Sequence, residues 1–253
     1  MFKAIDLNSK EIVALKLLSP ELLQNQENRD RFIREGQLMK SFTHPNIVKT
    51  FEFGETEQQG FIAMEYLTGG TLKEYLKISF PFTNEELKRI VKQICSGLQQ
   101  IHMQGIIHRD IKTANIMLDA NKNIRIMDFG LSRSPLAATM TTLGTAMGTL
   151  GYVVPEQITN VNVDHRADIF SLGVVLYELL TNRLPFTGEN EIAMIHSIFN
   201  TIPPLPSSIQ PEIGIGMDEI IKRCLTKNPV DRYSSVEELW ESFVQEIKEK
   251  YVS

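Results

Sequence analysis

The pattern of apolar and polar positions divides the chain into a strand-rich first part and a helix-rich remainder. Three segments of the first part are rich in aliphatic, β-branched or aromatic residues between turn signals, which predicts strands over 11–18, 47–53 and 60–66. A helix is expected between the first two strands, because Ser19 and Pro20 form a start signal and apolar residues recur along one face up to about Lys40. The motif Thr68-Gly-Gly-Thr71 then breaks the pattern, so we place a domain boundary after residue 67.

Helical periodicity dominates the second part. Thr83-Asn-Glu-Glu86 is a capping box, and the apolar residues that follow it at steps of three and four predict a long amphipathic helix. Two short apolar runs, 116–118 and 124–127, flank a turn-rich linker and predict a small hairpin. Further helices are expected to begin at Asp164, Glu191, Met217 and Ser235. This order predicts an α+β fold with a small β-rich lobe at 1–67, a larger mainly helical lobe at 68–253, and a ligand-binding cleft where they meet.

Composition and charge restrict the class of protein. The 253 residues are 42% apolar and 23% charged, and no apolar run reaches the roughly 18 to 20 residues that a membrane-spanning helix needs. The start of the chain lacks the features of a secretion signal, so we expect a cytoplasmic protein with no membrane segment in this chain. The net charge of -5, without a block of basic residues, argues against nucleic acid or an anionic membrane as the main partner.

Four Cys and His residues, which are types that can bind metals, are expected to have structural roles instead. Cys95 and Cys224 lie among apolar residues at helical spacing, and neither has a second Cys or His at a metal-ligand spacing, so we predict buried reduced thiols. His44 is expected to form a turn after the first helix. His102 is expected to pack or to face solvent.

Chemically active side chains concentrate in two short motifs of the second part. His108-Arg-Asp-Ile-Lys-Thr-Ala-Asn115 places an acid, two bases and an amide where no helical or strand periodicity accounts for them. Asp128-Phe-Gly130 follows directly after an apolar strand. In the first part, Lys16 stands in an otherwise apolar strand, and Glu35 lies on the apolar face of the next helix. Because a buried charge is costly without a partner, we expect Lys16 and Glu35 to pair.

In order and spacing, these residues resemble the catalytic domain of protein kinases. The resemblance runs from Met1 to about Phe243 and rests on V-A-L-K at 13–16, Glu35, H-R-D-I-K-x-x-N at 108–115, D-F-G at 128–130, Pro155-Glu156 and a later Asp and Arg. Lys112 and the segment 148–152 resemble the serine/threonine branch, with a bacterial character. The resemblance implies a bilobal kinase fold. It also implies transfer of the γ-phosphate of ATP to Ser/Thr hydroxyls of proteins, including autophosphorylation.

The resemblance assigns a role to each polar group of the site. Asp128 and Asn115 would hold Mg2+, because hard oxygen ligands suit that ion. Lys16, fixed by its partner on the first helix, would hold the α- and β-phosphates of ATP. Asp110 would orient the substrate hydroxyl and accept its proton, and Lys112 would meet the γ-phosphate during transfer.

The nucleotide base and the protein partners follow from the same resemblance. The adenine ring would lie between Ala14 and Met117, hydrogen-bonded to the backbone of Glu65 and Leu67. The implied partners are protein substrates that carry Ser or Thr, together with a second copy of the kinase in a dimer for autophosphorylation.

Regulatory positions lie in the segment between Asp128 and Glu156. Arg109 would receive a phosphate from this activation segment, because a phosphate of about -1.5 to -2 charge would order the loop. The candidate acceptors are Thr139, Thr141, Thr142 and Thr145. Thr149 would instead contact Asp110 and favour Ser/Thr substrates.

The residues expected to have structural roles are Glu156, Arg232 and Asp168. Glu156 would pair with Arg232, and Asp168 would hold the backbone of the catalytic loop. Thr113 replaces the usual Pro after Lys112, a departure that we do not expect to impair the chemistry.

The largest departure from the family pattern lies at the start of the sequence. The chain begins within the strand that follows the Gly-rich phosphate-binding hairpin, with Met1 where the family places a Val that covers adenine. We hypothesise that the start is misassigned or the gene truncated, and expect weak ATP binding by the chain as it stands. Two functions therefore remain open: an active serine/threonine kinase, or a catalytically weak or inactive kinase-like binding or scaffold module.

Overall fold

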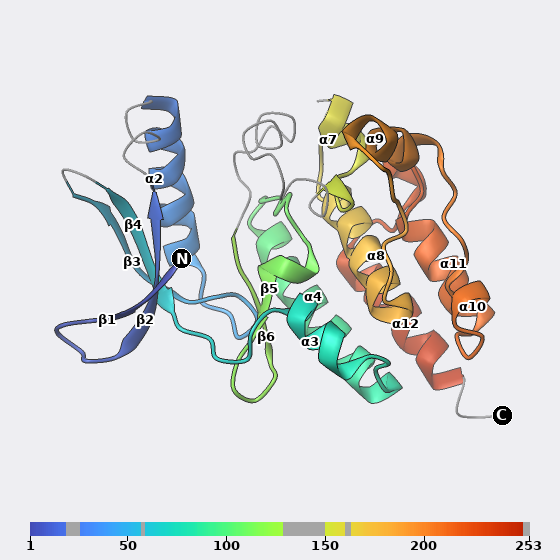
Figure 1. The fold of residues 1–253 in the computed structure, drawn as a ribbon, viewed down its shortest axis with the longest axis horizontal. Coiled ribbons are helices and arrows are strands. Elements are labelled where there is room, and N and C mark those ends of the chain that lie inside the picture. Colours follow the sequence, from blue (N-terminus) through green and yellow to red (C-terminus); the bar gives the residue numbers. More distant parts are fainter. Residues whose placement is uncertain (19–25, 57–58, 129–149, 160–162, 250–253) are drawn as a thin grey trace.

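In the part of the chain that the structure describes, a small sheet and one helix lie at one end and a larger helical lobe at the other, with a short hairpin between them (Figure 1). The computed structural model describes the chain except residues 19–25, 57–58, 129–149, 160–162 and 250–253, and the side chains of residues 27, 31 and 35. This arrangement confirms the predicted α+β, bilobal fold.

The sheet places Lys16 on a buried face. Its strands are β1 (Phe2–Ile5), β2 (Ile12–Leu18), β3 (Thr50–Glu55) and β4 (Gly60–Glu65). They pair in the order β1-β2-β4-β3, all antiparallel. Ala14 lies opposite Met64 and Lys16 lies opposite Ile62. Because opposite residues and residues two apart share a face of a sheet, these four side chains lie on one side, where Ile62 and Met64 are buried.

Helix α2 (Gln26–Ser41) packs closely against the sheet. Gly36 permits this approach, because a Cβ at that position would lie 2.5 Å from Cγ of Phe53 on β3. A glycine inside a helix costs about 1 kcal/mol relative to alanine, and the close packing offsets that cost. The helix ends near Lys40 as predicted, whereas the start signal at Ser19 and Pro20 lies outside the described residues.

The strand predicted over 47–53 begins later, at Thr50, because the residues before it pair with the hairpin instead. The hairpin consists of β5 (Ile116–Leu118) and β6 (Ile124–Ile126). The backbone nitrogen of Val48 donates to the carbonyl of Ile126 at 2.9 Å, and that of Ile126 donates to the carbonyl of Asn46 at 2.9 Å. The Asn46 side chain also donates to the carbonyl of Ile124. This pairing ties the first lobe to the hairpin that carries the second motif.

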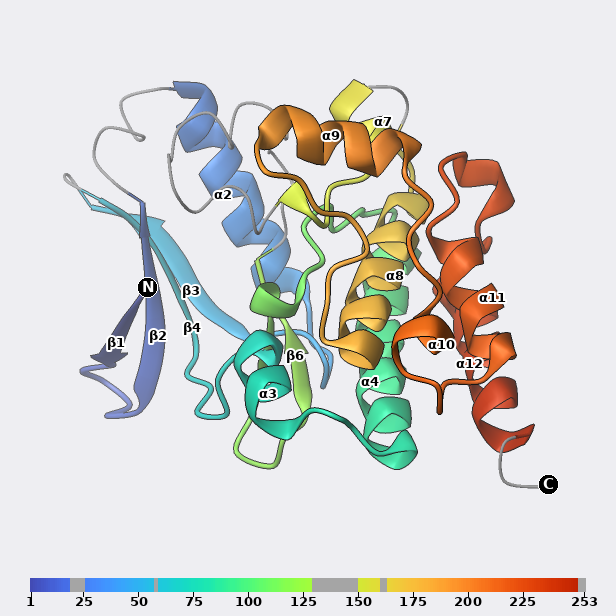
Figure 2. The same ribbon diagram turned by 45° about the vertical axis from the view of Figure 1, so that its right-hand side comes forward.

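The helical lobe is built around α8, which is buried from Ala167 to Thr181. Figure 2 shows α4 and α8 flanked by the other helices of this lobe. The described helices of the lobe are α3 (Leu72–Ser79), α4 (Asn84–Met103), α7 (Pro155–Thr159), α8 (Arg166–Thr181), α9 (Glu191–Asn200), α10 (Pro206–Ile209), α11 (Ile215–Cys224), α12 (Val236–Glu249) and the 3-10 turns η1 (Thr113–Asn115) and η2 (Pro229–Asp231). Helices α4, α8, α9, α11 and α12 match the predicted ones to within two residues.

Helix α3 was not predicted, although its signal is present in the sequence. The Thr71 side chain accepts a hydrogen bond from the backbone nitrogen of Glu74, and the Glu74 carboxylate accepts one from the backbone nitrogen of Thr71. The same kind of capping box starts α4. The capping box was overlooked in the sequence because α3 is short and directly follows a Gly-Gly pair.

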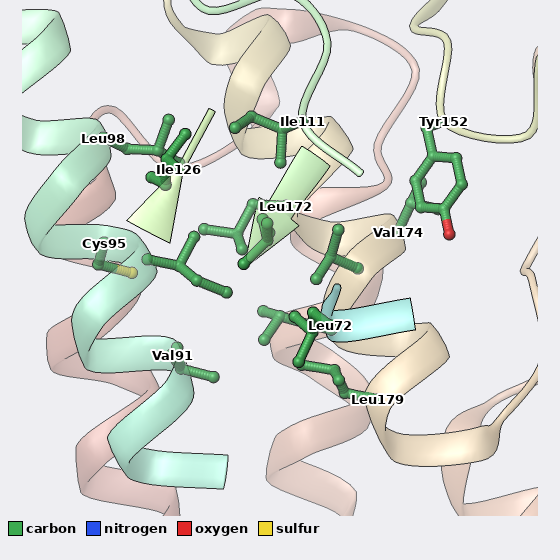
Figure 3. Packing of buried hydrophobic residues seen from close by; sticks show 14 of the residues in the cluster. Leu72, Val91, Cys95, Leu98, Ile111, Ile126, Tyr152, Leu172, Val174 and Leu179 are labelled. Atoms are coloured by element: carbon green, nitrogen blue, oxygen red, sulfur yellow. The ribbon is translucent and has the colours of Figure 1, made fainter. Parts of the chain in front are cut away.

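One continuous apolar core extends from the sheet to α12. Figure 3 shows the part of it around Cys95, Leu98 and Leu172. Cys95 and Cys224 lie within it as free, buried thiols, as predicted. Burial raises the pKa of Cys95 to about 12, so this thiol stays protonated near neutral pH. Within the described parts of the chain, none of the helices combines the length and apolar character that crossing a bilayer requires.

Candidate active site

His108 anchors the loop that connects α4 to the hairpin. Its side chain is fully buried, and burial lowers its pKa although the charges of Asp168 and Asp110 oppose that effect. Nδ1 accepts from the backbone nitrogen of Asp110 at 3.3 Å, so Nε2 carries the proton and donates to the carbonyl of Met127 at 3.1 Å. A neutral histidine therefore joins the first motif to the residue before Asp128.

Asp168, at the start of α8, holds the backbone of the same loop, as predicted. Its carboxylate is buried and accepts from the backbone nitrogens of His108 and Arg109, each at 2.8 Å. His102 Nε2 lies 2.8 Å from the same carboxylate and its side chain is 11% exposed, so His102 packs against α8, which is one of the two expected alternatives. Burial alone would raise the pKa of Asp168, but the hydrogen bond and charge of His102, with the other donors, outweigh burial and lower it.

The lowered pKa of Asp168 predicts a pH dependence of stability. A carboxyl whose pKa falls below its ordinary value of 3.8 on folding stabilises the protein above that pH, and the contribution is lost as the pH falls through the folded-state value. We expect the difference in unfolding free energy between wild type and Asp168→Asn to shrink as the pH falls from about pH 5 to below about pH 4. Urea unfolding of both proteins across this range measures it, and a difference that grows at low pH would contradict the expectation.

Asp110, Lys112 and Asn115 form a compact cluster in the loop, in which Lys112 and Asn115 are buried. Lys112 Nζ lies 2.9 Å from both carboxylate oxygens of Asp110. Asn115 Nδ2 donates to the Asp110 carbonyl at 3.0 Å and to its carboxylate at 2.6 Å. These bonds orient the Asp110 carboxylate and do not use the amide oxygen of Asn115.

Asp128 contacts Lys16, which lies on the sheet of the first lobe. Lys16 Nζ lies 2.5 Å from Asp128 Oδ1, and the two residues are 112 positions apart in sequence. The backbone nitrogen of Met127 donates to the carbonyl of Asn115 at 3.0 Å. This bond places the next residue, Asp128, beside the loop 108–115. Asp128 and Arg109 both have positive φ, at 57° and 67°, a backbone strain that is concentrated at functional sites.

The structure therefore brings together five predicted residues, which are Lys16, Asp110, Lys112, Asn115 and Asp128. Ala14 lies on the buried face of β2, and Met117 lies on β5, bridged to Thr71 of the segment that leaves β4. The side chain of Glu65 is occupied by Arg125 and by the backbone of Lys49. The side chain of Glu35 and the predicted phosphate acceptors lie outside the described residues, as does Thr149.

The predicted pair of Glu156 and Arg232 is confirmed. Arg232 NH1 and NH2 lie 2.6 and 2.9 Å from the two carboxylate oxygens of Glu156. Both side chains are buried.

Two interactions around the loop were missed from the sequence. Gln157 Nε2 donates to the carbonyl of Arg109 at 3.1 Å. Thr113, treated as a harmless departure, is bonded to Tyr152 and Glu178. The sequence did contain a signal for this second interaction, because Thr113 places a hydroxyl group where the family usually has Pro.

Comparison with known proteins agrees with this geometry. The model of the family described as the protein kinase domain matches residues 1–245. This chain belongs to the protein kinase domain family. Among curated relatives, serine/threonine-protein kinase pkn3 of Myxococcus xanthus is 35% identical over 94% of this chain, and PrkC of Bacillus subtilis is 34% identical over 94%. A solved structure of the PknI kinase domain of Mycobacterium tuberculosis superposes with a TM-score of 0.73 at 27% identity, covering 94% of this chain and 85% of that one.

The kinase domain described here is shorter than its curated relatives. The chain spans 45% of pkn3 from Myxococcus xanthus, 39% of PknB from Mycobacterium leprae and 37% of PrkC.

Proposed function

We propose that this protein transfers the γ-phosphate of ATP to serine and threonine hydroxyls of proteins, with Mg2+ as cofactor. The observation that carries the proposal is the 2.5 Å contact between Lys16 and Asp128, which joins the two lobes beside the Asp110 cluster. Phosphoryl transfer depends mainly on positioning and on neutralising charge, and these groups supply both.

The residues present fit a magnesium ion. Mg2+ is bound through one or two carboxylates and the substrate phosphates, and it prefers oxygen ligands. Asp128 offers a carboxylate of which Lys16 contacts one oxygen, and Asn115 keeps its amide oxygen free of the bonds to Asp110. When bound, Mg2+ neutralises charge that develops on the phosphates. Lys16 would contribute a second positive charge beside the α- and β-phosphates.

Asp110 would orient the acceptor hydroxyl and take its proton. Lys112 and Asn115 hold this carboxylate in one orientation, which is what positioning of a hydroxyl requires. Lys112, already 2.9 Å from that carboxylate, would meet the γ-phosphate during transfer.

The base of ATP would occupy the space beside the segment that leaves β4. Ala14 and Met117 would contact the two faces of the adenine ring, and the backbone of Glu65 and Leu67 would hydrogen-bond its edge. Glu35, on α2, would hold Lys16 in place. These assignments come from the family resemblance.

We further propose that the activation segment of one copy is an acceptor for another, in a kinase–kinase dimer. Its threonines at 139, 141, 142 and 145 are the candidate sites. A cytoplasmic setting, where ATP is available, is part of this proposal.

Labelled ATP tests the function directly. The full-length protein incubated with γ-labelled ATP and Mg2+ should acquire label on serine or threonine, which mass spectrometry of the digested protein identifies. Addition of EDTA should remove the incorporation, because Mg2+ is needed. Nucleotide binding without any incorporation into itself or into casein would reject the kinase function and favour a kinase-like binding module.

A further inference from the structure

Thr113 lies at the centre of a buried cluster of three oxygens. Its Oγ1 lies 3.0 Å from the hydroxyl of Tyr152 and donates to Oε2 of Glu178 at 3.0 Å, and the Tyr152 hydroxyl also donates to that carboxylate oxygen. All three residues are at least nine-tenths buried. Burial raises the pKa of Glu178 although both hydroxyl groups oppose that effect.

The three residues belong to three separate segments. Thr113 follows Lys112 in the catalytic loop, Tyr152 precedes α7, and Glu178 lies in the last turn of α8. The carbonyl of Tyr152 also accepts from Ser171 Oγ of α8 at 3.0 Å. Together with the Gln157 bond to Arg109, the cluster fixes segment 150–157 against the loop at two points.

The cluster and the lysine of the sheet belong to different lobes. Lys16 reaches Asp128 from the sheet, which is the side where the phosphates of ATP would be held. Thr113 instead faces α8 of the helical lobe. An acceptor hydroxyl must approach Asp110 from a direction that the phosphates leave open, and the segment that contains Tyr152 contacts the catalytic loop from the helical lobe, where Lys16 does not reach.

We propose that Thr113 is a positioning residue for the protein acceptor. Its hydroxyl holds segment 150–154 against the catalytic loop and thereby sets the affinity for the acceptor, without contacting ATP or the reacting atoms. A proline at this position, which has no hydroxyl, could not make either bond. This inference rests on the proposed kinase activity.

Thr113→Val tests the proposal, because valine has nearly the shape of threonine but no hydroxyl. The acceptor is a copy of the full-length protein that carries Asp128→Ala and a size tag, supplied at increasing concentrations to trace amounts of enzyme. We expect Thr113→Val to raise the KM for this acceptor about tenfold, in line with loss of a hydrogen bond to a buried acid, while kcat and the KM for ATP change less than about twofold. Thr113→Ser, which keeps the hydroxyl, should restore the acceptor KM.

Two further variants separate positioning from general damage. Tyr152→Phe removes the second donor and should raise the acceptor KM similarly, with the double variant no worse than the more affected single one, because the residues act as one unit. Thr181→Val removes another buried hydroxyl of α8, which donates to the carbonyl of Tyr177 at 2.7 Å, and should leave the acceptor KM unchanged.

Three results would overturn the inference. One is an unchanged acceptor KM in both Thr113→Val and Tyr152→Phe, another is a parallel loss in the KM for ATP, and the third is failure of Thr113→Ser to restore the wild-type value. If the wild-type protein transfers phosphate and any of these three results is obtained, only the positioning role of Thr113 is rejected. Absence of transfer by wild type rejects the proposed function and this inference with it.

Discussion

Replacing Asp128 by alanine is expected to lower the rate of phosphate transfer at least about a thousandfold, equivalent to about 4 kcal/mol in the barrier. The carboxylate is the proposed magnesium ligand and also the partner of Lys16 at 2.5 Å. Loss of one preorganised electrostatic group typically reduces kcat by about 100-fold to 1,000-fold, and Asp128→Ala removes one such group while releasing a second from its position. Initial rates of label transfer from ATP to casein measure the effect.

Asp119→Asn is the matched control. Asp119 lies in the turn of the β5–β6 hairpin, and its side chain is 19% exposed, against 23% for Asp128. Its carboxylate accepts from the backbone of Asn121 and Asn123 and lies 3.6 Å from Arg125 of β6, so its contacts stay within the hairpin. We expect this variant to keep transfer within about threefold of wild type, since it removes no group that reaches the phosphates. Equal losses in the two variants would show that the effect of Asp128→Ala comes from a distorted hairpin.

The residues of the candidate site were predictable because each lies within a short motif that has its own chemistry. The acid, two bases and amide in the loop 108–115 have no explanation in terms of helix or strand periodicity, and Lys16 is conspicuous in an apolar strand. Local signals also predicted α4, whose capping box and apolar stripe lie within one segment. The fold class followed from the order of such elements.

Long-range pairing accounts for what the sequence left unpredicted. The start of β3 moved because Ile47 bridges to Ile126, and nothing near residue 47 indicates that partner. His102 reaches Asp168 across 66 positions, and Thr113 reaches Glu178 across 65. A histidine or threonine has the same local pattern whether it contacts solvent or a buried carboxylate, so only the packing of α4, α8 and the loop identifies these bonds.

The largest expected change in stability follows from removing the carboxylate of Glu156. All five N–H groups of the buried Arg232 guanidinium are used, two on Glu156 and three on the carbonyls of Arg166, Thr226 and Lys227. The Phe170 ring lies 4.8 Å from its central carbon. Glu156→Ala leaves this charge buried without its partner, which typically costs about 3 to 5 kcal/mol. That loss is a large fraction of the roughly 5 to 15 kcal/mol that holds a domain folded.

Equilibrium unfolding in urea, followed by far-ultraviolet circular dichroism, measures the loss. Glu219→Ala provides the comparison, because Glu219 pairs with Lys222 at 3.4 Å with both side chains 65% exposed, and exposed pairs contribute less than about 1 kcal/mol. Adding Arg232→Met to Glu156→Ala removes the stranded charge but leaves three backbone carbonyls without their donor. The double variant should therefore be less destabilised than the sum of the two single variants, yet remain less stable than wild type. Strict additivity would mean that the two side chains stabilise the helical lobe independently, and that the 2.6 Å contact between them contributes nothing to folding.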